Sequence, residues 1–357
     1  MPTRTQGNQS IPDIERIIEI DFVRATEAAA LSVFKWVGKG DKNAADGAAC
    51  DAMRGMFDLM GICGECVIGE GIKDEAPGIF VGEHLGKWNL DTIKFDIAVD
   101  PIDGTTNVSK GLPNSISVLC AASPEQGIKQ ALKHVPSFYS TKLAYGPRVK
   151  NYMTKVGLAQ VKLENPIEEN LEIIGKALGK RVQDLTVIML DRPRHESLVK
   201  GIRATGAALR MIGDGDITAA IAPSMPETGV DLYVGIGGSP EGVIAAAAIK
   251  CLGGDMQMKM WPRDDKERAQ LIQDGYEEAL RKVDYADDLA HGKNIIFCAT
   301  GISDSTLLPG IKVVNHRAIT HTILMRAKFR TIRYITTHHD LLTKTIRLRS
   351  DNREHPL

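Results

Sequence analysis

The chain has 357 residues, of which 43% are hydrophobic and 25% charged, and its formal net charge is -1 at pH 7. This composition is typical of a globular protein that buries a sizeable core without disulfides. The charge gives no electrostatic reason to expect nucleic acid or a membrane as partner. No stretch approaches the ~20 apolar residues that span a bilayer. We expect a cytoplasmic protein, or a plastid stromal one whose transit peptide has been removed.

Two helices are expected first. Apolar residues recur at three- and four-residue steps between residues 11 and 36, which is the period of an amphipathic helix. An alanine-rich segment, residues 44–53, predicts the second helix. Asp46 stands in or near its first turn, where it either complements the helix dipole or belongs to a site.

A short apolar strand over residues 66–68 then leads to Glu70, a carboxylate between two glycines at the strand end. Cys63 and Cys66 have the spacing of a metal or redox pair. We expect both to be small residues in a turn and strand start of a reduced protein. A thiol switch that acts on the neighbouring Glu70 is the alternative.

The most informative stretch is residues 100–107, with the sequence DPIDGTTN. The alternating residues 94–99 predict a strand that ends at Asp100. A proline and a glycine then favour a sharp bend, which holds the carboxylates of Asp100 and Asp103 close together. Such carboxylates repel unless a cation lies between them, and Mg²⁺ or Mn²⁺ prefers these ligands. A plain acidic β-turn is the alternative.

The second half repeats the pattern of a strand followed by a polar turn. Arg192 and Arg194 straddle Pro193 after a predicted strand over residues 186–190. Two guanidiniums before a helix suit bidentate phosphate contacts, and a solvated basic loop is the alternative. A helix entered through Pro166 gives the best boundary between two tightly docked halves, residues 1–165 and 166–357.

Two further turns carry acids. Asp214 and Asp216 flank Gly215 after a predicted strand, and the following residues exclude a calcium loop, so contact with sugar hydroxyls is preferred. The glycine-rich residues 235–242 lack the spacing of a dinucleotide loop and place Glu241 at a helix start. We therefore interpret Glu241 as a metal ligand.

The remaining elements are expected to be structural. Residues 264–283 predict a charged amphipathic helix, and residues 294–301 predict a buried strand. His338 and His339 point to opposite faces of a β segment and cannot readily share a metal. The basic residues 326–349 predict an amphipathic sheet edge and tail.

Taken together, these segments resemble the class II, bacterial-type fructose-1,6-bisphosphatases within the inositol-phosphatase-like superfamily. The resemblance covers roughly residue 20 to the C-terminus and rests on residues 39–46, 67–71, 100–105, 139–147, 192–196, 214–216, 235–242 and 330–333. It implies a layered αβαβα sandwich with mixed sheets. It also implies metal-dependent hydrolysis of the 1-phosphate of fructose 1,6-bisphosphate and, in photosynthetic members, of sedoheptulose 1,7-bisphosphate. A homodimer or homotetramer is expected.

The resemblance also implies roles for individual residues. Asp46 and Glu70 are similar to ligands of one Mn²⁺ or Mg²⁺ ion, and Asp100, Asp103 and Glu241 to ligands of a second. Asp100, Asp103 and Thr105 are the implied catalytic residues. The implied substrate contacts are Asp103, Gly104, Thr105, Tyr139, Arg192, Pro193, Arg194, Asp214, Gly215, Asp216 and Gly238.

Two departures leave the number and type of metals open. Most class II enzymes have Glu where this chain has Asp103, and Ile72 replaces their usual second acid near Glu70. Asp103 and Asn107 favour an inositol-monophosphatase-like enzyme as the alternative activity. A catalytically silent sugar-phosphate or metal sensor is the alternative from another functional class.

Overall fold

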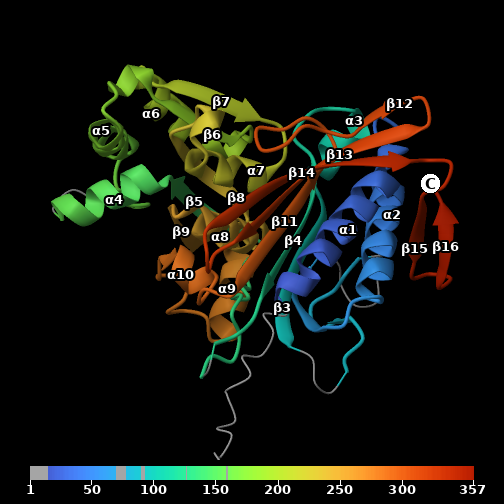
Figure 1. Ribbon diagram of the computed structural model, residues 1–357. Coiled ribbons are helices and arrows are strands. Elements are labelled where there is room, and N and C mark those ends of the chain that lie inside the picture. Colours follow the sequence, from blue (N-terminus) through green and yellow to red (C-terminus); the bar gives the residue numbers. More distant parts are fainter. Residues whose placement is uncertain (1–14, 70–77, 90–92, 126, 158–159) are drawn as a thin grey trace, which may run out of the picture.

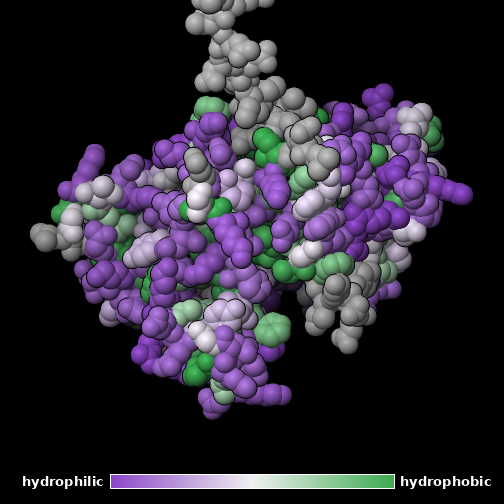
Figure 2. Space-filling view, turned by 90° about the horizontal axis from the view of Figure 1, so that it is seen from below, coloured by the Kyte–Doolittle hydropathy of each residue, from purple (hydrophilic) through white to green (hydrophobic). Residues whose placement is uncertain are grey.

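The computed structural model describes residues 15–69, 78–89, 93–125, 127–157 and 160–357. Its layers follow the order helices, sheet, helices, sheet, helices (Figure 1). The expected αβαβα sandwich with mixed sheets is confirmed. Every helix within these ranges is too short or too polar to cross a bilayer. The face in Figure 2 is mainly hydrophilic, with small scattered hydrophobic areas.

The larger sheet has the order β12-β13-β11-β4-β3-β1-β2, and β14 pairs with the other side of β13. β1 and β3 are parallel, whereas β3 and β4 are antiparallel. Alternate β4 residues serve different layers, since Val118 belongs to the central core and Leu119 to the core under α1 and α2. The strands are β1 (Cys63–Ile68), β2 (His84–Leu85), β3 (Lys94–Asp103), β4 (Ile116–Ala122), β11 (Ile295–Gly301), β12 (Lys312–Val314), β13 (Arg317–Arg326) and β14 (Thr331–Asp340).

The smaller sheet has the order β10-β9-β5-β8-β6-β7, and β6 is parallel to both of its neighbours. Its strands are β5 (Tyr139–Tyr145), β6 (Thr186–Leu190), β7 (Ala208–Ile212), β8 (Leu232–Gly238), β9 (Asp255–Met260) and β10 (Asp284–Tyr285). Each sheet takes strands from both sides of residue 165. The division into halves 1–165 and 166–357 stays a prediction.

The helices form the three other layers. The central helix α8 is apolar nearly all round, because both sheets cover it. One outer layer consists of α1 (Glu15–Phe34) and α2 (Lys42–Phe57). The central layer consists of α7 (Asp216–Ile221), α8 (Ser239–Leu252) and α10 (Ala286–Leu289). The other outer layer consists of α4 (Pro147–Val156), α5 (Ile167–Leu178) and α6 (Glu196–Ala204). Two peripheral helices are α3 (Thr105–Lys110) and α9 (Asp265–Gln273).

Two predicted element ends are wrong. β3 does not end at Asp100 but continues to Asp103, which pairs with Ile116 of β4 beyond a register shift. Pro101 lies within that irregular part, where its missing N–H disturbs no regular ladder. The helix expected to reach residue 283 ends at Gln273, because Gly275 has a φ of +85° that a right-handed helix cannot continue.

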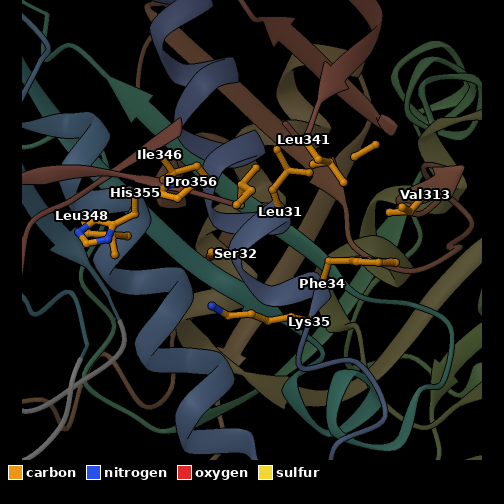
Figure 3. Close-up of a pocket in the computed structure, with 12 residues that line it drawn as sticks. Leu31, Ser32, Phe34, Lys35, Val313, Leu341, Ile346, Leu348, His355 and Pro356 are labelled. Atoms are coloured by element: carbon orange, nitrogen blue, oxygen red, sulfur yellow. The ribbon is translucent and has the colours of Figure 1, made fainter. Parts of the chain in front are cut away.

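The C-terminal segment forms the predicted sheet edge and tail. On the edge strand β14, His339 is buried and His338 exposed, so the two rings do lie on opposite faces. A terminal hairpin of β15 (Thr345–Leu348) and β16 (Arg353–Pro356) then packs on α2. Its Ile346 and Leu348 close an apolar cavity of about 180 Å³ against Leu31 of α1 (Figure 3).

Candidate active site

A polar cavity of about 270 Å³ lies where the turns after β3, β6, β7 and β8 meet. Most of the predicted site residues line it: Asp100, Asp103, Gly104, Thr105, Tyr139, Arg192, Arg194, Asp214, Asp216, Gly238 and Glu241. Asp46 lies beside it through a contact with Thr105. Pro193 and Gly215 stand between lining residues in the chain. Glu70 lies outside the described residues.

The turn after β3 places both of its carboxylates in the cavity. Asp100 is buried, and its Oδ1 accepts a hydrogen bond of 3.0 Å from the Ile102 backbone N–H. Gly104 ends the strand with a φ of +96° and begins α3. A β-carbon at Gly104 would lie 2.6 Å from the Asn114 carbonyl oxygen, so both conformation and space require glycine there.

Asp46 is available to the site because another residue caps its helix. Asp41 is the N-cap of α2, and its side chain accepts from the Ala44 N–H. The Thr105 hydroxyl lies 3.3 Å from Asp46 Oδ1 and 3.1 Å from the Ile102 carbonyl, so it donates to one of them at a time. Burial raises the pKa of Asp46 to about 6, although Thr105 and Lys42 oppose the shift.

The cavity concentrates more negative charge than the protein balances. Burial raises the pKa of Asp103 well above its usual range, and Asp216, Asp214 and Glu241 add to the shift by repulsion. Burial also raises the pKa of Glu241. Among the residues that the structure describes, the buried Oε2 atom of Glu241 has no hydrogen-bond partner. An unpartnered buried carboxylate oxygen among other acids is the electrostatic condition that a bound cation relieves.

Gly238 makes room for that carboxylate. A β-carbon at position 238 would lie 1.9 Å from Glu241 Oε2. The glycine thus allows Glu241, in the first turn of α8, to fold back against the end of β8. In the part of the chain that the structure describes, no three acidic, histidine or cysteine side chains converge into a closed metal site. Mg²⁺-type ions commonly take one or two carboxylates and complete their shell with water and substrate phosphate, so the donors present fit such an ion.

One cation of the site was not predicted. Lys142 of β5 is buried, and its Nζ lies 2.6 Å from Asp216 Oδ2. The Tyr233 hydroxyl donates to the other Asp216 oxygen. Asp216 therefore lines the cavity with both oxygens already engaged. The period of two in β5 was the available signal, because it puts Lys142 on the same face as the buried Ser140 and Ala144.

The basic side of the cavity carries the predicted arginines. Arg194 Nη2 donates to the Ile236 carbonyl at 2.8 Å, and its guanidinium lies 4.8 Å from the Tyr139 ring centroid. Arg192 Nη1 donates to the Gly213 carbonyl at 2.6 Å. Both guanidiniums are partly exposed to the cavity and keep further donors for an anion.

His195, which the sequence analysis passed over, fixes this basic side. Its Nδ1 lies 2.8 Å from the Leu190 carbonyl, and its Nε2 accepts from the Ile236 N–H at 2.8 Å. Because Nε2 accepts a hydrogen bond and Nδ1 faces a carbonyl, the geometry suits a proton on Nδ1, and burial lowers the pKa of His195, which favours the neutral ring. It ties the end of β6 to β8, and its neighbour Arg194 is held to the same Ile236.

The turns of the two sheets are joined directly. Asp214 Oδ2 accepts from the Thr106 backbone N–H at 3.3 Å. The Asn107 side-chain amide lies within 3.2 Å of the Asn114 carbonyl and 3.3 Å of the Asp214 carbonyl. Gly215 takes a φ of +95° to make the connection. These bonds bring the acidic turn of the larger sheet against the basic turns of the smaller one.

Comparisons with known proteins give one family. Residues 16–339 match the model of the bacterial fructose-1,6-bisphosphatases that are glpX-encoded. The chain is 42% identical over 339 residues to a class 2 fructose-1,6-bisphosphatase of Haemophilus influenzae, covering 92% of this chain and 97% of that protein. It is 40% identical over 342 residues to fructose-1,6-bisphosphatase 1 class 2 of Escherichia coli K12, covering 92% of this chain and 96% of that protein.

Proposed function

Because the chain belongs to the family of bacterial class 2 fructose-1,6-bisphosphatases, we propose that it hydrolyses the 1-phosphate of fructose 1,6-bisphosphate. The products are fructose 6-phosphate and phosphate, and the step serves gluconeogenesis or, in a photosynthetic host, the Calvin cycle. One observation carries the proposal. A single cavity holds Asp100, Asp103 and a carboxylate oxygen of Glu241 that no described residue bonds, and two arginines lie opposite these acids. A bisphosphate with a sugar between its phosphates suits this separation of charge.

The acids take the role of metal ligands in this proposal. Asp100, Asp103 and Glu241 would hold one Mn²⁺ or Mg²⁺ ion, whose charge would draw the three side chains together, and Asp46 and Glu70 would hold a second. When bound, these ions neutralise the scissile phosphate and lower the pKa of a coordinated water. Thr105 supports this chemistry from α3, since its hydroxyl donates toward Asp46 or Ile102. The same hydroxyl oxygen can accept a hydrogen bond from the attacking water and so help to hold it, or the hydroxyl can orient the phosphate.

The remaining residues bind and orient the substrate. Arg192, Arg194 and Tyr139 hold the phosphate that does not react, and the energy of that remote contact positions the scissile group. Asp214 and the loop glycines 104, 215 and 238 contact the sugar. Asp216 is a positioning residue, because its oxygens are bonded to Lys142 and Tyr233. Pro193 sets the path of the loop between the arginines.

Phosphate release tests this function. Wild type and Asp100→Asn are assayed on fructose 1,6-bisphosphate, sedoheptulose 1,7-bisphosphate and inositol 1-phosphate, each with Mg²⁺, Mn²⁺ or EDTA. We expect turnover of fructose 1,6-bisphosphate that EDTA abolishes and that falls by at least ~100-fold in the variant. Asp265→Asn, an exposed acid in the first turn of α9, is the matched control and keeps full activity.

The alternatives correspond to other outcomes of the same assay. Binding of fructose 1,6-bisphosphate without phosphate release under any metal identifies a silent sensor. Cleavage of inositol 1-phosphate at a similar rate identifies the monophosphatase activity. The structure gives that activity little support, because Asn107 is bonded to Asn114 and Asp214 and does not line the cavity. Sedoheptulose 1,7-bisphosphate cleavage would extend the substrate range.

We also propose a cytoplasmic homodimer or homotetramer. The relatives are bacterial, which favours the cytoplasm over a plastid. β14 is an edge strand of ten residues whose exposed face carries Ile332 and Tyr334, at 40% and 59% exposure. Long edge strands with exposed apolar side chains are suited to pairing between chains. Sedimentation of wild type and Tyr334→Lys tests this assembly, and a monomeric wild type would contradict it.

A further inference from the structure

A second polar cavity lies at the opposite end of α8 from Glu241. Its volume is about 440 Å³. Four segments far apart in the sequence line it: α4 with Lys150, the end of α8 with Gly253 and Gly254, residues 286–293, and the turn between β13 and β14. Because α8 has 14 residues and rises ~1.5 Å per residue, roughly 20 Å separate this basic cavity from the acids of the candidate active site.

The basic cavity has an excess of positive charge. Five cations line it, against the single carboxylate of Asp287: Lys150, Lys250, Lys293, Lys328 and Arg330. The charge of Lys250 is already balanced, because its Nζ lies 2.6 Å from Asp287 Oδ1. The same Nζ also donates to two backbone carbonyls. Lys150 Nζ lies 2.9 Å from Asp255. Within the described ranges, the other three cations have no ion-pair partner, so an uncompensated charge of about three remains.

One of these cations occupies a turn position that arginine rarely takes. Arg330 has a φ of +49°, a left-handed conformation that favours glycine or asparagine. Its guanidinium lies beside Gly253, where a β-carbon would be 3.4 Å from Nη1. The turn therefore keeps a strained arginine that points at the end of α8 and makes no ion pair there. Backbone strain at a cation that makes no ion pair with any described residue favours a ligand-binding role.

We propose that the basic cavity binds the phosphate group of a small molecule. Arginine and lysine donors are the usual ligands of phosphate, and a doubly charged anion balances most of the local excess. The volume falls in the range of small-molecule sites, ~300–1,000 Å³. The cavity is lined by four separate segments and bordered by Asp287, which disfavours an extended nucleic acid. The proposal does not depend on the proposed enzymatic function.

Binding of inorganic phosphate in EDTA separates this site from the candidate active site. Without metal, the acids around Asp103 repel an anion, and the cavity variant leaves Arg192 and Arg194 unchanged, so phosphate binding that this variant loses belongs to the basic cavity. Equilibrium dialysis with labelled phosphate compares wild type with a triple variant of the unpaired cations, Lys293→Gln, Lys328→Gln and Arg330→Gln. A matched triple variant removes three exposed lysines elsewhere: Lys87→Gln, Lys266→Gln and Lys312→Gln. Asp100→Asn serves as the active-site control.

We expect wild type to bind one phosphate per chain, and the cavity variant to bind it at least tenfold more weakly. The matched variant and Asp100→Asn should stay within twofold of wild type. The two triple variants should melt within a few degrees of wild type, because the replaced lysines and Arg330 are exposed. Equal loss in the matched variant would show a general charge effect and overturn the proposal. Absence of phosphate binding by wild type in EDTA would overturn it as well.

Discussion

Replacing Gly238 by alanine tests the metal role of Glu241 most directly. The backbone of Gly238, with φ −63° and ψ 138°, suits any residue, so the substitution acts only through the added methyl group. That group would lie 1.9 Å from Glu241 Oε2, whereas real contacts of a β-carbon stay above 3.0 Å. The carboxylate must therefore move by about 1.1 Å. Since metal ligands are placed to within ~0.2 Å, Glu241 would leave the metal.

The assay is phosphate release from fructose 1,6-bisphosphate as a function of Mn²⁺ concentration. We expect the metal concentration for half-maximal rate to rise at least ~10-fold, and the rate at limiting metal to fall by ~100-fold. Gly61→Ala is the matched control, because a β-carbon there meets no atom within 4 Å. If both variants had the metal dependence and maximal rate of wild type, Glu241 would not be a ligand and the reasoning would fail.

Three further predictions concern stability and redox chemistry. Lys142→Met removes the cation that balances the buried charge of Asp216. This should lower the free energy of unfolding by about 3–5 kcal/mol in urea titrations. Burial lowers the pKa of His339 to about 4, below the ~6.5 of an unfolded histidine, so stability is lost as pH falls from ~6.5 to 4. His339→Gln should flatten that pH dependence of urea unfolding. Cys63 and Cys66 are three positions apart in β1 and so face opposite sides, and burial raises the pKa of the Cys66 thiol to about 12. Activity should therefore be equal in reductant and in mild dithiol oxidant, and a reversible loss on oxidation would revive the thiol switch.

Predictions from local pattern succeeded where a single segment decides the structure. Residues 294–301 predicted a buried strand, which the structure forms over Ile295–Gly301, and the helix after Pro166 begins where expected. The end of β3 was missed because its last residues pair with β4, a partner that residues 94–103 do not specify. The helix after Asp264 was overextended because its period continues past Gly275, whose backbone conformation ends it.

The candidate site shows the same limit. Asp100, Asp103 and Glu241 were found because each stands near the end of a predicted strand and beside a proline or glycine, which is a local signal. Lys142 and His195 were missed, since a lysine in a strand and a histidine in a loop gain their roles only from partners far away in the chain. The family resemblance supplied the residue roles, and the model brings most of those residues into one cavity.

By itself, the sequence determined which residues stand at strand ends and turns, because hydrophobic period, proline and glycine act within a few residues. Only the tertiary structure decided which of these turns meet and which of their groups ionise. A carboxyl group's pKa depends on its burial and on charges from other segments. Asp103 shows this, since its raised pKa comes first from burial and then from Asp216, Asp214 and Glu241, all more than a hundred residues away.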